Sequence, residues 1–246
     1  MLQRIRASIP APVKRGVRHA LLDPIGQRVR DWQLRAMIRQ LRAGASLTRS
    51  KAMRLREVWG NKGFSADCSF LLEVARSVAC SSGPVLECGT GLTTVVAALA
   101  AEQKGTSVWC LEQDPEWAAA VRRRLRMHGI ANVEVRVAPL REYEGFAWYN
   151  LADVELPQHF ALVVCDGPAI FEPTPFAAAW RYGVIPILAE RRVHVSELLL
   201  DDADDPRASR LLSHWATEFG VNYRVVDTGD GKWARVIPEP PQRDDP

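Results

Sequence analysis

The chain has 246 residues, of which 47% are hydrophobic and 25% are charged. These proportions are typical of a globular protein, and they exclude a disordered chain, a collagen-like chain and a small disulfide framework. The longest apolar run, around residues 95–101, is far shorter than the roughly 20 residues that span a membrane.

The net charge of +3 hides two regions of opposite sign. Residues 1–60 contain 14 Lys and Arg but only 3 Asp and Glu, a balance of +11, whereas the rest of the chain has a balance of −8. We expect a basic N-terminal helical arm over residues 1–60, a main domain over 61–238 and a frayed tail over 239–246. The first interpretation of the arm is a solvated pair of lid helices. The alternatives are attachment to an anionic membrane and contact with an acidic or phosphate-bearing partner, without specific recognition of nucleic acid.

The five cysteines are widely spaced, with no C-x-x-C pair and no cluster with histidine. This pattern argues against a zinc site and is typical of buried, reduced thiols. The first arginines are not followed by the apolar segment of a secretory signal. We therefore expect a cytoplasmic protein.

Hydrophobic periodicity predicts helices at 29–41 and 51–58, followed by a helix that begins after Ser65 as its N-cap. From residue 84 onward, strands and helices alternate. Strands are predicted at 84–87, 107–112, 133–137, 160–165, 193–200, 221–226 and 232–237, and helices at 95–103, 115–128, 174–190 with a kink or end at Pro186, and 211–219. This alternation predicts an α/β fold with a doubly wound, mostly parallel sheet and an antiparallel final hairpin.

Acidic residues stand where the apolar strands end. They are Glu87, Glu112, Asp166, Asp201 and Asp202. In open α/β sheets, ligands bind beyond the carboxyl ends of the strands. The recurrence of carboxylates there is the most informative pattern in the sequence.

The first of these ends opens a glycine-containing turn. Gly89 and Gly91 allow a tight turn and close approach of a ligand. Thr94 stands where a dinucleotide fingerprint has Gly or Ala, and the carboxylate of Glu87 suits a cation better than a diphosphate. Glu112 lies 21 residues after Gly91 and can accept hydrogen bonds from both hydroxyls of a ribose. Together these residues predict a nucleoside with a cationic, amino-acid-like part, which describes S-adenosylmethionine.

Several segments resemble those of class I S-adenosylmethionine-dependent methyltransferases. The segments Val85–Gly91 and Val108–Asp114 look like the first and second motifs of that family. The segments Val164–Pro168, Trp180–Pro186 and Leu199–Ala203 are similar to its bacterial small-molecule O-methyltransferase branch. The resemblance covers about residues 59–238 and departs mildly at Thr93, where the family has a third glycine. It implies a Rossmann-like fold with a seven-stranded sheet.

The resemblance also implies roles for single residues. Gly89 and Gly91 would wrap the methionine part of the cofactor, Glu87 would face its ammonium group, and Glu112 would hold the ribose. Ala138 would flank the adenine, and Asp166 would lie beside the reacting methyl group. Two further residues, Trp59 and Asn61, would close over the cofactor.

Asp166 and Asp202 are the candidates for the base that accepts the proton of the methyl acceptor. With Asp201 they form a cluster whose oxygen atoms suit magnesium, as in methyltransferases that act on catechol-like oxygens. We assign no metal site, because the third ligand would be Asp202 rather than an amide and no lysine closely follows Asp166. The structural alternative is that Asp201 and Asp202 cap the next turn.

The expected function is methyl transfer to a small-molecule or glycan-type acceptor at oxygen, with Trp148 and Tyr149 as the substrate wall. Two alternatives remain. An NAD-dependent oxidoreductase is disfavoured by Thr94 and by the missing Tyr-x-x-x-Lys pattern. A non-catalytic, partner-binding protein with a methyltransferase fold would keep the cofactor residues but would not turn over.

Overall fold

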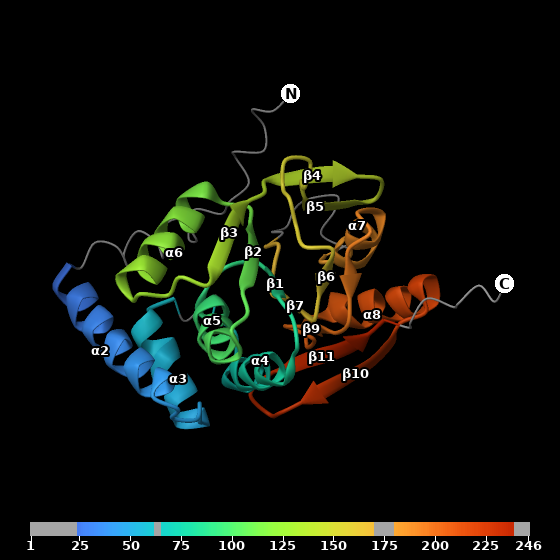
Figure 1. The fold of residues 1–246 in the computed structure, drawn as a ribbon. Helices are drawn as coiled ribbons and strands as arrows, with labels where there is room; N and C mark the ends of the chain where they lie inside the picture. Colours follow the sequence, from blue (N-terminus) through green and yellow to red (C-terminus); the bar gives the residue numbers. More distant parts are fainter. Residues whose placement is uncertain (1–23, 62–64, 170–179, 239–246) are drawn as a thin grey trace.

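A central seven-stranded sheet carries the fold (Figure 1). The computed structural model describes residues 24–61, 65–169 and 180–238. The strands of this sheet are β1 (Val85–Cys88), β2 (Val108–Glu112), β3 (Val133–Val137), β7 (Leu162–Cys165), β9 (Leu198–Leu200), β10 (Asn222–Asp227) and β11 (Lys232–Ile237). Their order across the sheet is β10-β11-β9-β7-β1-β2-β3.

The topology confirms the predicted doubly wound, mostly parallel sheet. β1 pairs in parallel with β2 on one side and with β7 on the other. β11 is antiparallel to both β9 and β10, so the final hairpin has the predicted antiparallel pairing. Because the chain runs outward in both directions from β1, the strand order reverses between β1 and β7. A ligand site is expected beyond the carboxyl ends of these two strands.

Helices cover both faces of the sheet. One face carries α4 (Cys68–Cys80), α5 (Leu92–Lys104) and α6 (Pro115–Met127), and the other carries α7 (Val184–Glu190) and α8 (Pro206–Phe219). Alternate strand residues pack into the two layers, so that Leu162 faces the first layer and Val163 the second. Strands covered on both faces need apolar residues throughout, which explains their continuous hydrophobic runs.

The two described helices of the basic arm form an outer layer. α2 (Pro24–Arg42) and α3 (Arg49–Trp59) lie against α4 and α5 (Figure 1). Leu34 and Ile38 of α2 and Leu55 of α3 are fully buried in the same hydrophobic core as those helices. The arm is therefore packed onto the main domain from α2 onward. Among the helices that the structure describes, none combines the length and hydropathy needed to cross a bilayer.

Two local predictions were wrong. The N-cap of α4 is Asp67 rather than Ser65, whose hydroxyl instead donates to the carbonyl of Asn61. Pro186 does not kink or end a helix, because α7 begins at Val184 and the proline lies in its first turn, where backbone N–H groups have no partner within the helix. The remainder of the helix predicted at 174–190 lies partly outside the described residues.

Short strand pairs depart from the sequence-based expectation. The strands predicted at 160–165 and 193–200 are each interrupted, which leaves β6 (His159–Phe160) and β8 (His194–Val195) as a separate parallel pair. A hairpin of β4 (Leu140–Tyr143) and β5 (Phe146–Tyr149) replaces a predicted loop.

Candidate functional site

The turn between β1 and α5 consists of only three residues. Gly89 has a φ of +93°, in the left-handed region that favours glycine. A Cβ atom at Gly89 would lie 3.2 Å from the backbone nitrogen of Gly167, which follows β7. A Cβ atom at Gly91 would have no heavy atom of the described residues within 4 Å, apart from those of its chain neighbours. Gly91 therefore leaves open space at the N-terminus of α5, which a ligand can enter.

Glu87 stabilises this turn from a fully buried position. Its Oε2 accepts hydrogen bonds from the hydroxyl of Thr94 at 2.6 Å and the thiol of Cys110 at 3.2 Å. Oγ1 of Thr94 in turn accepts the N–H of Gly91 at 2.9 Å. The buried Oε1 of Glu87 has no hydrogen-bond partner among the described residues. Burial raises the pKa of Glu87 to about 7, although the hydrogen bonds from Thr94 and Cys110 act to lower it.

The raised pKa of Glu87 predicts a specific dependence of stability on pH. The folded state binds this proton up to about pH 7, whereas an unfolded chain releases it near pH 4.3. The charge of Glu87 therefore destabilises the fold progressively as the pH rises through this window, by the order of 3 kcal/mol in total. In Glu87→Gln this loss disappears, because the amide does not ionise.

Urea unfolding of both proteins at pH 5 and pH 8 measures the effect. At each pH, the free energy of unfolding of the wild type is subtracted from that of Glu87→Gln. This difference is expected to be larger at pH 8 than at pH 5 by about 3 kcal/mol. The exposed Glu142→Gln on β4 is the matched control and should show no such difference. A wild-type-to-variant difference that is the same at both pH values would contradict the prediction.

Glu112 ends β2 beside the same turn and is almost fully buried. Its Oε2 accepts the hydroxyl of Thr90 at 2.6 Å, and its Oε1 accepts the N–H of Asp114 at 2.9 Å. Burial raises the pKa of Glu112, and the hydrogen bonds from Asp114 and Thr90 oppose that rise. Each carboxylate oxygen can accept more than one hydrogen bond, so Glu112 retains capacity for ribose hydroxyls.

Hydrogen bonds from Trp117 and Ala138 fix the backbone around Glu112. The indole N–H of Trp117 donates to the carbonyl of Thr90 at 2.8 Å, which fixes the turn against α6. The backbone N–H of Ala138 donates to the carbonyl of Glu112 at 2.8 Å, and the Ala138 side chain is fully buried. Ala138, which is predicted to flank the adenine, therefore lies directly beside Glu112, which is predicted to bind the ribose, and the two residues stand at adjacent strand ends. The open turn and the neighbouring carboxylate fit an adenosyl cofactor that carries a cationic group.

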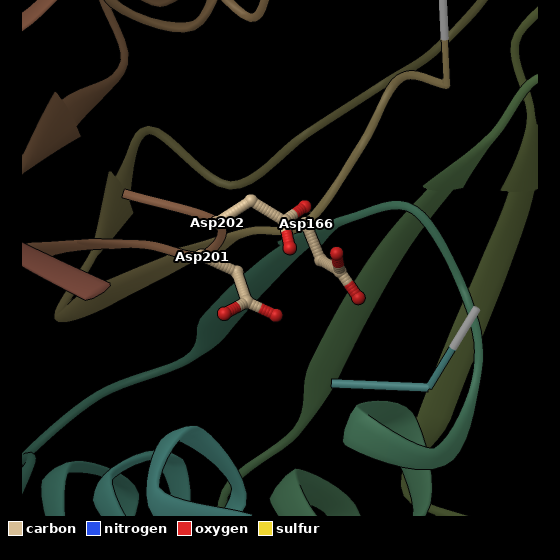
Figure 2. A group of neighbouring side chains, drawn as sticks. All are labelled: Asp166, Asp201 and Asp202. Carbon is tan, nitrogen blue, oxygen red and sulfur yellow. The ribbon is translucent and has the colours of Figure 1, made fainter. Parts of the chain in front are cut away.

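The three aspartates that follow β7 and β9 come together at the carboxyl edge of the sheet (Figure 2). One oxygen from each of Asp166, Asp201 and Asp202 lies within 4.8 Å of the others. Asp201 is buried, Asp166 is half-buried and Asp202 is exposed. The sequence predicted this grouping because neighbouring parallel strands end at the same edge.

Arg181 joins this group, and the sequence analysis gave it no role. Its side chain is only 4% exposed. The guanidinium donates to the carbonyls of Asp166 at 2.6 Å and Asp201 at 2.7 Å, and to the carboxylate of Asp202 at 2.7 Å. It also lies 3.4 Å from the carboxylate of Asp166 and stacks over the ring of Trp180, 4.0 Å from its centroid. One buried cation thus holds the ends of β7 and β9 together.

The contacts of Arg181 argue against a magnesium ion bound by this group. Burial raises the pKa of Asp166 to about 6; the charge of Arg181 opposes this and that of Asp202 adds to it. Burial, together with the charges of Asp166 and Asp202, raises the pKa of Asp201 well above its ordinary value, which favours the neutral carboxyl. Magnesium takes carboxylate oxygens as ligands. Because Arg181 already contacts the other two, the cluster as arranged does not fit this metal.

Two predicted contacts with ligands were wrong. Trp148 and Tyr149 do not form a substrate wall, because both are fully buried in the core on the α7 and α8 side of the sheet. A Cβ atom at Gly183 would lie 2.6 Å from the Trp148 side chain, which shows how closely α7 packs on it. Trp59 does not close over a cofactor, because it is buried in the other core beneath the guanidinium of Arg124, 4.1 Å from its ring centroid.

No protein-family model and no curated protein matches this chain. Solved structures do match. The chain is similar to the O-methyltransferase TomG from Streptomyces achromogenes in complex with SAM, with 16% identity over 77% of this chain and 88% of that one and a TM-score of 0.53. It is similar to a SAH-bound methyltransferase from Podospora anserina, with 12% identity over 77% and 86% of the two chains and a TM-score of 0.56. An O-methyltransferase from Bacillus cereus in complex with SAH matches with 14% identity over 84% and 91% and a TM-score of 0.51. At these identities the likeness establishes the fold, and this chain has the fold of class I methyltransferases.

Proposed function

We propose that this protein transfers a methyl group from S-adenosylmethionine to an oxygen of a small-molecule or glycan-type acceptor. One observation carries the proposal. Thr90 links the open turn at Gly91 to the carboxylate of Glu112, beside the point where the strand order reverses. The similar structures support it, since those from Streptomyces achromogenes and Bacillus cereus are described as O-methyltransferases with SAM or SAH bound.

The geometry of the turn disfavours a dinucleotide. A diphosphate at a helix N-terminus is bound by free backbone N–H groups. Here the N–H of Gly91 already donates to Thr94, and the carboxyl of Glu87 lies directly behind it. Both features suit a cationic ligand better than an anionic one. This favours S-adenosylmethionine over the NAD of the alternative oxidoreductase.

The bound cofactor would supply a methyl group on a positively charged sulfur. Glu112 would accept hydrogen bonds from the ribose hydroxyls, and the turn at Gly89 and Gly91 would hold the methionine part. Asp166, with a pKa of about 6, is largely ionised at neutral pH and would accept the proton of the acceptor hydroxyl as the oxygen takes the methyl group. Asp202, which is exposed and paired with Arg181, is the second candidate base.

Isothermal calorimetry with S-adenosylmethionine, S-adenosylhomocysteine and NAD tests the cofactor. Micromolar affinity for the first two ligands and none for NAD is the expected result. Transfer of a radiolabelled methyl group to a panel of hydroxylated metabolites and glycans then tests turnover. Binding of NAD alone would favour the oxidoreductase. Cofactor binding without transfer to any acceptor would favour the partner-binding alternative.

Methyl transfer is expected to be independent of divalent metal. Because Arg181 contacts two carboxylates of the cluster, removing metal with EDTA or adding magnesium should change the rate by less than about twofold. A magnesium-dependent O-methyltransferase assayed under the same conditions is the control and should lose its activity in EDTA. A similar loss here, restored by magnesium, would show that the cluster binds the metal during turnover.

A further inference from the structure

The outward face of α2 exposes apolar side chains. Leu34 and Ile38 point into the core, whereas Val29 and Trp32 are 50% and 67% exposed. They are three residues apart and therefore neighbours on the helix surface. Trp32 is the most exposed large hydrophobic side chain among the described residues. Most of the Trp32 surface is therefore not packed against the described part of the chain.

Exposed arginines surround these side chains. Arg28, Arg35 and Arg39 of α2 are exposed, and the guanidinium of Arg35 donates to the carbonyl of Met127 at 3.3 Å. This contact places the C-terminal end of α6 beside α2, and Met127 is itself 43% exposed. We call the resulting surface the basic apolar face. It consists of Val29, Trp32, Met127, Arg28, Arg35 and Arg39.

No carboxylate of α2 balances this charge. The only acidic residue of the helix is Asp31, which is mostly buried and lies 3.7 Å from Arg124. Nearby, Glu102 of α5 is bonded to Arg42 through both oxygens at 2.8 Å. These two carboxylates therefore serve other arginines, and among the described residues Arg28, Arg35 and Arg39 have no carboxylate partner.

The mixture of side chains favours a lipid surface over other partners. Arginines around an exposed tryptophan and aliphatic groups are the arrangement by which interfacial helices contact phosphate headgroups and the adjoining acyl region. In a symmetric dimer through this face, arginines would meet arginines, which is unfavourable. A nucleic acid would use the arginines but would leave the aliphatic side chains of Val29 and Met127 without a partner.

We propose that the basic apolar face docks on a membrane surface rich in anionic lipid, with Trp32 among the headgroups and the arginines on lipid phosphates. Residues 1–60 carry a balance of +11, which adds to the attraction. α6 begins at the carboxyl end of β2 and Met127 is its last residue, so the face lies toward the opposite edge of the sheet. The docked protein would keep its candidate site open to the solvent.

Sedimentation of the full-length protein with lipid vesicles tests the proposal. We expect binding to vesicles that mix phosphatidylcholine with phosphatidylglycerol, weakening with salt, and no binding to phosphatidylcholine alone. Trp32→Ser should weaken binding about tenfold, and Arg28→Glu with Arg39→Glu should abolish it. Tyr223→Ser and Arg224→Glu alter exposed residues of β10 and are the matched controls, which should bind as the wild type does.

Unchanged thermal unfolding of each variant shows that the fold is intact. Failure to bind anionic vesicles, or binding that survives both sets of variants on α2, would overturn the proposal. Tighter binding to single-stranded RNA than to vesicles, lost in the same variants, would assign the face to nucleic acid instead. A dimer that dissociates in Trp32→Ser would assign it to a second copy of this chain.

Discussion

Replacing Arg181 by methionine is expected to lower the free energy of unfolding by about 3–5 kcal/mol, because the change leaves buried acidic groups without their cation. The guanidinium bridges the carbonyls of Asp166 and Asp201 and the carboxylate of Asp202 from a buried position. Methionine fills a similar volume but donates no hydrogen bond. Urea unfolding of the wild type and the variant at pH 7 measures the difference.

Two further variants make the Arg181 prediction sharper. Arg181→Lys keeps the charge but lacks the planar arrangement of donors that reaches all three acceptors, so an intermediate loss is expected. Asp202→Asn removes only an exposed partner and should cost less than about 1 kcal/mol. Without the guanidinium the three carboxylates become a site for a hard cation. Magnesium should therefore stabilise Arg181→Met and leave the wild type unchanged. A loss below about 1 kcal/mol in Arg181→Met would contradict the structural role.

Replacing Glu112 by alanine is expected to weaken the affinity for S-adenosylhomocysteine by about 100-fold. Two hydrogen bonds from ribose hydroxyls to a carboxylate contribute at least about 1.5 kcal/mol each, and both would be lost. Glu112→Gln retains one acceptor oxygen and should lose about tenfold. Calorimetry measures both variants under the conditions used for the wild type.

The control for Glu112 is Glu116→Gln, which changes an exposed carboxylate in the first turn of α6 and should bind normally. Thr90 and Asp114 lose a hydrogen-bond acceptor in Glu112→Ala, so circular dichroism must show that the variant is folded. Unchanged affinity in a folded Glu112→Ala would remove the ribose role from this residue and, with it, the main support for the cofactor.

The sequence predicted the sheet and the glycine-containing turn after β1 because both are encoded locally. A strand buried on both faces needs a continuous apolar run, and in this chain Glu87, Glu112 and Asp166 stand at or next to the ends of such runs. Parallel strands place their carboxyl ends at one edge, so the meeting of these residues follows from the strand pattern alone. The conformation of Gly89 is equally local, since its positive φ is fixed by a three-residue turn.

Contacts between distant segments could not be predicted in this way. Arg181 reaches acceptors 15 to 21 residues away along the chain, and nothing in its own neighbourhood marks it as the buried cation of the site. Trp148 was interpreted as part of a substrate wall because its short hairpin has no strong periodicity, yet it is fully buried and packed against Gly183 at the start of α7.

The amino-acid sequence by itself therefore determined the α/β alternation, the glycine turn, and the carboxylates at the strand ends of this protein. Only the tertiary structure decided that Arg181 contacts Asp166 and Asp202, and that Trp59 is buried while Trp32 is exposed. The physical reason is that burial and charge pairing depend on which surfaces meet after the elements form. Hydrophobic periodicity fixes the elements, but it does not specify the neighbour that each side chain acquires.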